Sequence, residues 1–190
     1  MKHRRKKGEY GYRAYHRSVQ VGEVLFGLAM ILAQLGARGL TEQQAMKNIL
    51  TVMAILSVLP TANVASPLLA AWRYKTPPKA FYDRVNPYEA RYPVLYDLIL
   101  TSREAVMPVD AAAVHPTGVY LYCTSPKVNA RQAEKFLNDM FTTHRLDPHV
   151  HMIQDERAFF QRLDSLKPMA EYEDDGSVDY TLELLKQLSM

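Results

Sequence analysis

The residues with the sharpest spacing for chemistry are histidines near position 149. On a strand, His149 and His151 point to the same face, where two imidazoles could hold one metal ion. The third ligand could be His144, Asp147 or the more distant His115. The alternative is that these residues lie in a turn and an edge strand and face water. Since the pattern lacks a fixed third ligand, we predict no metal and no cofactor.

Nucleophilic chemistry would rest on Cys123, the only cysteine. A single cysteine excludes a disulfide within the chain and zinc sites built from cysteine pairs. A reactive thiolate needs a neighbouring base, and nothing in the sequence places one there, so we predict a buried structural thiol. No phosphate-binding glycine loop, nucleophile elbow or zinc-protease motif is present. We therefore predict no catalytic residue, and nothing in the sequence favours an enzyme.

Seven cations, interleaved with tyrosines, precede the first apolar segment. They are Lys2, Arg4, Arg5, Lys6, Lys7, Arg13 and Arg17. Cations mixed with aromatic rings could bind nucleic acid. Beside a membrane span, the same cations contact anionic lipid headgroups, at about 1 kcal/mol each. We predict a basic tail over residues 1–20 that contacts lipid, and we do not expect a nucleic-acid partner.

Charge is divided unevenly along the chain. Residues 1–72 contain 9 Lys and Arg and 3 acids, whereas residues 73–190 contain 14 Lys and Arg and 17 acids. A basic, apolar front part joined to a mildly acidic rear part indicates two physical environments.

Two apolar segments are candidates for membrane spans. Residues 49–72 carry no charge, and about 20 residues of apolar helix cross a hydrocarbon core. Residues 21–37 are apolar except for Glu23 and Gln34, each near one end. The second segment is followed at once by aromatic rings and cations, which are typical of a membrane interface. These anchor residues are Trp72, Arg73, Tyr74 and Lys75.

Lys and Arg are concentrated before the first segment and after the second, with only Arg38 and Lys47 between. Because cytoplasmic flanks carry the excess of cations, we predict a two-helix hairpin over residues 21–72 in the cell membrane, with both termini cytoplasmic. Three other interpretations remain open. They are a cleaved signal peptide, a soluble hairpin buried in a core, and a single crossing with residues 21–37 lying in the interface.

Small residues recur every four positions in both segments. They are Ala29, Ala33 and Ala37 in the first, and Ala62, Ser66 and Ala70 in the second. Such stripes let helices approach closely in lipid, although alanine is common in membrane helices for other reasons. Pro60 and Pro67 predict a kink in the second helix.

The rear part reads as a small α+β domain. Residues 73–91 are rich in proline, charge and tyrosine and predict a juxtamembrane linker. Within residues 92–190, strands are predicted near 105–109, 119–123 and 149–153, whereas residues 92–101 are apolar and could form either a helix or a strand. Asn129, Asp155 and Asp179 each precede an amphipathic helix that they could cap. The order of elements predicts helices on one face of a short sheet.

Two stretches resemble a known group of sequences. They are residues 6–12 (Lys-Lys-Gly-Glu-Tyr-Gly-Tyr) and residues 47–62, from Lys47 to Ala62. In these the chain looks like an uncharacterised group of small two-span membrane proteins from clostridia-like bacteria. The resemblance covers roughly the first 70 residues and the rest only in layout. It implies a membrane hairpin and no particular activity.

The sequence thus favours a bacterial membrane-tethered interaction or regulatory module. Its expected partners are membrane lipids and an unidentified protein or a second copy of the chain. One alternative is a metal-assisted hydrolase using the region of His149 and His151. The other is a nucleic-acid-binding domain held at the membrane.

Overall fold

The structure is a computed structural model, and it describes residues 5–102, 105–147, 149–173 and 175–190. The chain divides into two compact units. The hairpin comprises Ala14–Arg73, and the domain comprises the chain up to Arg13 together with Tyr74–Met190. The predicted tail over residues 1–20 and linker over residues 73–91 are therefore not separate segments, because residues 5–13 and 74–91 fold with the domain.

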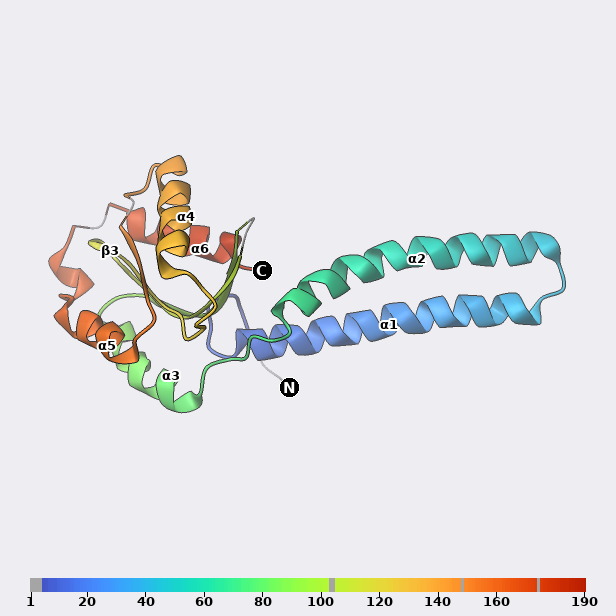
Figure 1. Cartoon of the computed structure of the whole chain (residues 1–190), viewed down its shortest axis with the longest axis horizontal. Helices are drawn as coiled ribbons and strands as arrows, with labels where there is room; N and C mark the ends of the chain where they lie inside the picture. The colour runs from blue at the N-terminus through green and yellow to red at the C-terminus, as the bar shows by residue number, and fades with distance from the viewer. Residues whose placement is uncertain (1–4, 103–104, 148, 174) are drawn as a thin grey trace. The chain divides into compact units, whose positions relative to one another are not determined.

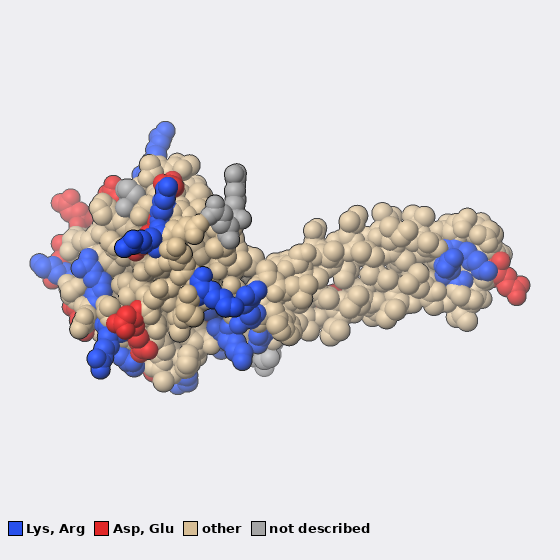
Figure 2. All heavy atoms as spheres, in the orientation of Figure 1, with Lys and Arg blue, Asp and Glu red and all other residues tan. Residues whose placement is uncertain are grey.

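The hairpin consists of two long antiparallel helices, α1 (Tyr12–Leu40) and α2 (Gln44–Ala71), joined by a short turn (Figure 1). Both are long and apolar enough to cross a membrane, and only 6% of the most apolar window of each is buried. On the face of the hairpin that Figure 2 shows, charged side chains are absent from most of its length. A core helix of a soluble protein would be mostly buried, so the exposure disfavours the soluble-hairpin interpretation. α2 bends in its C-terminal half, as its two internal prolines predict (Figure 1).

The two helices face each other through polar and small residues. Gln34 Nε2 donates to Ser57 Oγ at 3.2 Å. A Cβ at Gly27 would lie 2.3 Å from Thr61 Oγ1, so this approach requires glycine. The predicted stripes do not form this contact, since all six of their residues are exposed: Ala29, Ala33, Ala37, Ala62, Ser66 and Ala70. The two helices of the hairpin therefore do not pack through those stripes.

The domain is built on a four-stranded sheet with strands in sequence order. The strands are β1 (Val94–Thr101), β2 (Val106–His115), β3 (Gly118–Tyr122) and β4 (Val150–Ile153). The first three are antiparallel, and β4 runs parallel to β3. The domain also contains helices α3 (Lys79–Val85), α4 (Ala130–Thr143), α5 (Glu156–Ser165) and α6 (Ser177–Leu188), and the 3-10 turns η1 (Asn86–Ala90) and η2 (Met169–Glu171). The predicted combination of a helical pair with an α+β domain is confirmed at this level.

Helices cover both faces of the sheet, contrary to the prediction of one face. α4 and α6 pack on one face, where Leu137 and Leu185 are fully buried, and α3 and α5 pack on the other, with Val85 and Phe159 fully buried (Figure 1). The additional layer consists of α5, which the sequence predicts as a helix, and α3, which lies in the segment that the sequence predicts as linker.

The predicted helix caps are correct for two helices. Asn129 accepts from the backbone of Gln132, and Asp155 accepts from that of Ala158. The cap predicted at Asp179 is wrong, because α6 already begins at Ser177.

The outer edge of β1 is covered by both ends of the chain. Tyr96 N donates to the carbonyl oxygen of Gly8 at 2.7 Å, and Met190 N donates to that of Ile99 at 3.0 Å. The terminal segments therefore act as short additional strands on this edge.

The outer edge of β4 is covered by side chains of α4. Asn138 Oδ1 accepts from Val150 N at 2.9 Å, and Glu134 Oε1 accepts from Met152 N at 2.8 Å. These strand amides are therefore satisfied without another strand.

Candidate functional site

β1 and β2 both change face at the same level of the sheet. Tyr96 pairs with Ala111, and both belong to the core beneath α3 and α5. The next pair, Leu98 and Val109, belongs to the core beneath α4 and α6. In regular strands, residues two apart share a face. The change occurs at Asp97, whose φ of 56° lies in the left-handed region that Asp tolerates better than most residues.

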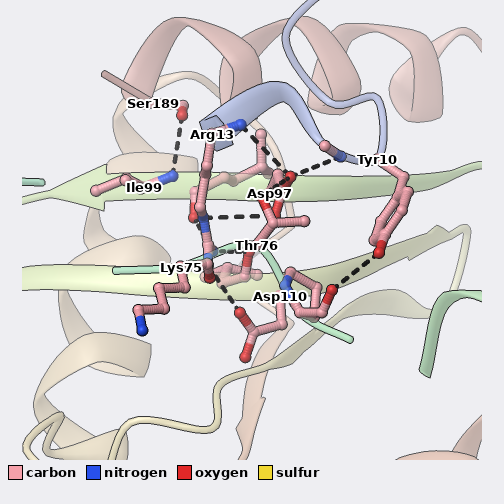
Figure 3. Close-up of polar contacts among 12 residues, drawn as sticks. Tyr10, Arg13, Lys75, Thr76, Asp97, Ile99, Asp110 and Ser189 are labelled. Atoms are coloured by element: carbon pink, nitrogen blue, oxygen red, sulfur yellow. Dashed lines mark hydrogen bonds and ion pairs between the residues drawn. The ribbon is translucent and has the colours of Figure 1, made fainter. Parts of the chain in front are cut away.

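The guanidinium of Arg13 occupies this interruption of the strand pairing (Figure 3). Its Nη2 donates to the carbonyl oxygens of Leu98 at 2.8 Å and Val109 at 2.6 Å. Its Nη1 donates to Asp110 Oδ1 at 2.8 Å and to the carbonyl oxygen of Lys75 at 3.0 Å. Because a guanidinium presents several donors in a fixed plane, one side chain satisfies acceptors from three segments.

Asp97 accepts hydrogen bonds from both segments that adjoin the hairpin (Figure 3). Its Oδ2 accepts from Gly11 N at 2.7 Å and from Thr76 Oγ1 at 3.0 Å. Its Oδ1 lies 3.7 Å from Arg13 Nε, and neither atom has a hydrogen bond within the described residues. Burial raises the pKa of Asp97, and the guanidinium of Arg13 and the hydrogen bonds offset part of that rise.

Asp110 completes the site, which we call the Arg13 cluster (Arg13, Thr76, Asp97 and Asp110). Its Oδ2 accepts from the backbone N of Thr124 at 3.1 Å. The side chains of the arginine and the two aspartates are exposed by only 4%, 0% and 9%. Since two carboxylates share one buried cation, the cluster holds structure together rather than presenting groups to a substrate. It fastens the segments before and after the hairpin to one point of the sheet.

Arg13 therefore does not contact lipid, and that prediction is wrong because its side chain is buried within the domain. Lys2 and Arg4 lie outside the described residues. Arg5 and Lys6 are exposed. Lys7 Nζ donates to the carbonyl oxygen of Ser189 at 2.6 Å.

The residues predicted as an interface anchor lie at the end of α2. Trp72 is 54% exposed, and within the hairpin the guanidinium of Arg17 lies 5.6 Å from the centre of its ring. Arg73 and Lys75 are exposed, and Tyr74 is half-buried. Lipid contact by these residues stays a prediction.

The candidate metal ligands have separate neighbours. His144 Nδ1 lies 3.0 Å from Tyr180 Oη. The ring of His151 stacks on Tyr120 at 5.5 Å, whereas His149 lines a cavity. Within the described part of the chain, no three His, Cys, Asp or Glu side chains are grouped so that they could hold a metal ion.

His115 and Cys123, two other candidates from the sequence, are both buried. His115 Nδ1 lies 2.7 Å from Thr117 Oγ1, and its Nε2 lies 3.1 Å from the carbonyl oxygen of Lys167. Burial lowers the pKa of His115, which favours the neutral ring. Cys123 is fully buried, and burial raises the pKa of its thiol. The prediction of a buried cysteine is confirmed.

A polar cavity of about 260 Å³ lies at one end of the sheet. The β2–β3 turn, the C-terminal end of α4 and the N-terminal end of α6 form its walls. Its charged lining residues are Arg145, Asp147, Glu173 and Asp175. The mixed signs suit a polar, charged ligand.

Arg145 has an unusual backbone for its residue type. Its φ is 59°. Arg145 N donates to the carbonyl oxygen of Thr142 at 3.0 Å, and Leu146 N donates to that of Phe141 at 2.9 Å. These two bonds form the Schellman motif, in which glycine is the usual residue at this position. An arginine here costs stability that glycine would not.

The sequence analysis did not identify the Arg13 cluster, although a signal was present. Asp97 and Asp110 each interrupt an apolar strand, and an unpaired buried carboxylate is costly. That pattern calls for a buried cation. Sequence spacing alone does not identify Arg13 as its source, because the partners are 84 and 97 residues apart.

We compared the chain with known protein families, curated proteins and solved structures. A scan against protein-family models and searches of curated proteins and of solved structures find no match to this chain.

Proposed function

We propose that this protein is a membrane-anchored interaction module, in which the hairpin crosses the bilayer and the domain binds a partner in the cytoplasm. The observation that carries the anchoring is the location of exposed apolar side chains. Of 19 large hydrophobic residues exposed in the described chain, 18 lie between Val19 and Trp72, and the other is Tyr180. An apolar surface of this extent must be shielded from water, and the hydrocarbon core of a bilayer shields two long apolar helices.

The lengths of the helices support a full crossing. The 25 residues between Lys47 and Arg73 are uncharged, and at about 1.5 Å per residue they extend roughly 37 Å. The hydrocarbon core is about 30 Å thick. In α1, the stretch between Arg17 and Arg38 contains one charge, Glu23, which could reach the interface from its position near the end.

Cation placement supports an orientation with both termini in the cytoplasm. Arg5, Lys6 and Lys7 precede the hairpin, and Arg73, Lys75 and Lys79 follow it, while only Arg38 and Lys47 lie near its turn. The positive-inside rule then places the turn outside. Membership of the clostridia-like two-span group is part of the same proposal and rests on the resemblance alone.

The cavity beside Arg145 supports the binding role of the domain. Arg145 lines this polar cavity and has a positive φ, and backbone strain of this kind is commonly kept at functional positions. A metal-assisted hydrolase has less support, because the histidines near position 149 have separate neighbours. A nucleic-acid partner has less support because residues 73–190 carry more acids than cations.

Cysteine labelling in intact cells tests the anchoring and the orientation. The background is Cys123→Ala, and single cysteines replace Glu42 in the turn or Lys127 on the exposed surface of the domain. A membrane-impermeant maleimide should label residue 42 in intact cells and residue 127 only after permeabilisation.

Two outcomes would contradict the proposal in different ways. Labelling of residue 42 from the cytoplasmic side alone means that the hairpin does not cross. Labelling of residue 127 from outside means a single crossing or the reverse orientation. As a matched check, alkaline carbonate should leave the unmodified protein in the membrane pellet.

A further inference from the structure

α2 has a second face that repeats with the same spacing as the face toward α1. The positions toward α1 are half-buried or buried: Ala54, Ser57, Thr61, Val64 and Leu68. Two residues further along from each lie exposed positions: Leu56, Leu59, Asn63, Ser66 and Ala70. At 3.6 residues per turn, a shift of two residues is about 200°. The exposed set therefore lies opposite α1, and its alternating spacing of three and four is that of a helix-packing seam.

Asn63 is the polar centre of this outer face. Its side-chain amide makes no hydrogen bond with another described residue. Pro67 lacks the N–H that would donate to the carbonyl oxygen of Asn63 in a regular helix. One position thus carries an unpaired side-chain amide and a backbone carbonyl deprived of its helical donor.

The position of Asn63 along α2 makes this arrangement costly in lipid. It lies nine residues from Trp72 and sixteen from Lys47, which is about 14 Å and 24 Å along the helix. In a hydrocarbon core about 30 Å thick, the residue is near the middle. Polar groups at that depth have no water and need a partner within protein.

We propose that two copies of the chain associate in the membrane through this outer face of α2, with Asn63 of each copy bonding Asn63 of the other. An asparagine amide is self-complementary, since it both donates and accepts. A two-fold axis brings the same residues of both copies together. Ser66 and Ala70, one and two turns away, are small enough to let the helices approach. This inference rests on the proposed crossing of the bilayer.

Dilution in lipid vesicles tests the association. Full chains carrying donor and acceptor dyes at Lys127→Cys, in the Cys123→Ala background, are reconstituted over a range of protein-to-lipid ratios, and energy transfer reports the dimer. Asn63→Leu should weaken association roughly 3- to 30-fold, the range for one interhelical polar contact in lipid. Asn48→Leu, the matched change at the other asparagine of α2, should leave it unchanged, and Asn63→Gln should keep part of it.

Cross-linking provides a second measurement that does not depend on removing Asn63. A cysteine at Ser66 should form a disulfide-linked dimer under mild oxidation, whereas a cysteine at Leu28, which is exposed on α1, should not. Equal cross-linking at both positions, or equal energy transfer for Asn63→Leu and the parent, would overturn the dimer.

Carbonate extraction of the same samples separates the two proposals. A protein released by carbonate refutes the membrane anchor and the dimer together. A protein that stays in the pellet but shows no energy transfer at any ratio refutes the dimer alone.

Discussion

Replacing Arg13 by methionine removes the only cation from the Arg13 cluster while keeping much of the side-chain volume. The loss leaves Asp97 and Asp110 buried without a counter-charge. It also leaves three backbone carbonyl oxygens without the hydrogen bonds that Arg13 donates to them, those of Leu98, Val109 and Lys75. Breaking a buried ion pair from one side costs about 3–5 kcal/mol. Domains are stable by about 5–15 kcal/mol in total, so Arg13→Met should remove a large part of the stability of the domain.

Hydrogen exchange on the full chain in detergent micelles measures this loss locally. Since 1.4 kcal/mol is tenfold in an equilibrium constant, protected amides of β1 and β2 should exchange about 100- to 3,000-fold faster in Arg13→Met. Arg17→Met is the matched control, because Arg17 lies one turn further along α1 and contacts a tryptophan ring instead. The exchange rates of Arg13→Lys should lie between those of the parent and Arg13→Met, since an ammonium restores the charge without the planar guanidinium. Equal exchange in the Arg13→Met and Arg17→Met proteins would refute the role assigned to the cluster.

Three further predictions concern Asp97, Arg145 and the histidine pair. Because folding raises the pKa of Asp97, the folded state binds more protons at this group between its unfolded pKa, about 4, and its raised folded pKa, so this group makes stability fall as pH rises through that interval and then level off. The free energy of unfolding of Asp97→Asn should therefore increase relative to that of the parent as pH rises above about 4 in denaturant titrations, and a difference that is constant with pH contradicts this. Arg145→Gly should raise the stability by about 1 kcal/mol, seen as a Tm a few degrees higher, because glycine adopts a positive φ without strain; Arg145→Ala should not. Changing His149 and His151 together to Asn should change Tm little, and elemental analysis should find no stoichiometric zinc; one zinc per chain, lost in the double variant, contradicts this.

Local signals in the sequence predicted the elements of the domain well. Asn129 and Asp155 cap the helices that follow them, because capping depends only on residues three positions away. The start of α6 was misplaced because Gly176, at φ 74°, already sets the turn before the helix. α3 was missed because prolines precede it, although Phe81 and Val85 form a buried face.

Features that depend on distant residues could not be predicted in the same way. Gly8 bonds Tyr96 and Arg13 bonds Asp110, although the whole hairpin lies between the partners in the sequence. A basic N-terminal sequence beside an apolar helix has the composition expected at a lipid surface, whatever its actual neighbours are. Only the two aspartates within apolar strands indicated that one of the cations had to be internal.

The closed edges of the sheet restrict how this protein can recognise or be recognised. An open edge strand is a template for another extended chain, and it supports both peptide capture by strand addition and uncontrolled self-assembly. Here the carbonyl oxygen of Gly8 accepts from the amide of Tyr96, and the amide of Met190 donates to the carbonyl oxygen of Ile99 on β1. On β4, Asn138 and Glu134 accept from the amides of two alternate residues. If the hairpin is in a membrane, as we propose, copies of the chain meet often, and the occupied edges then disfavour fibrous growth. Recognition is thereby left to helix surfaces and to the cavity.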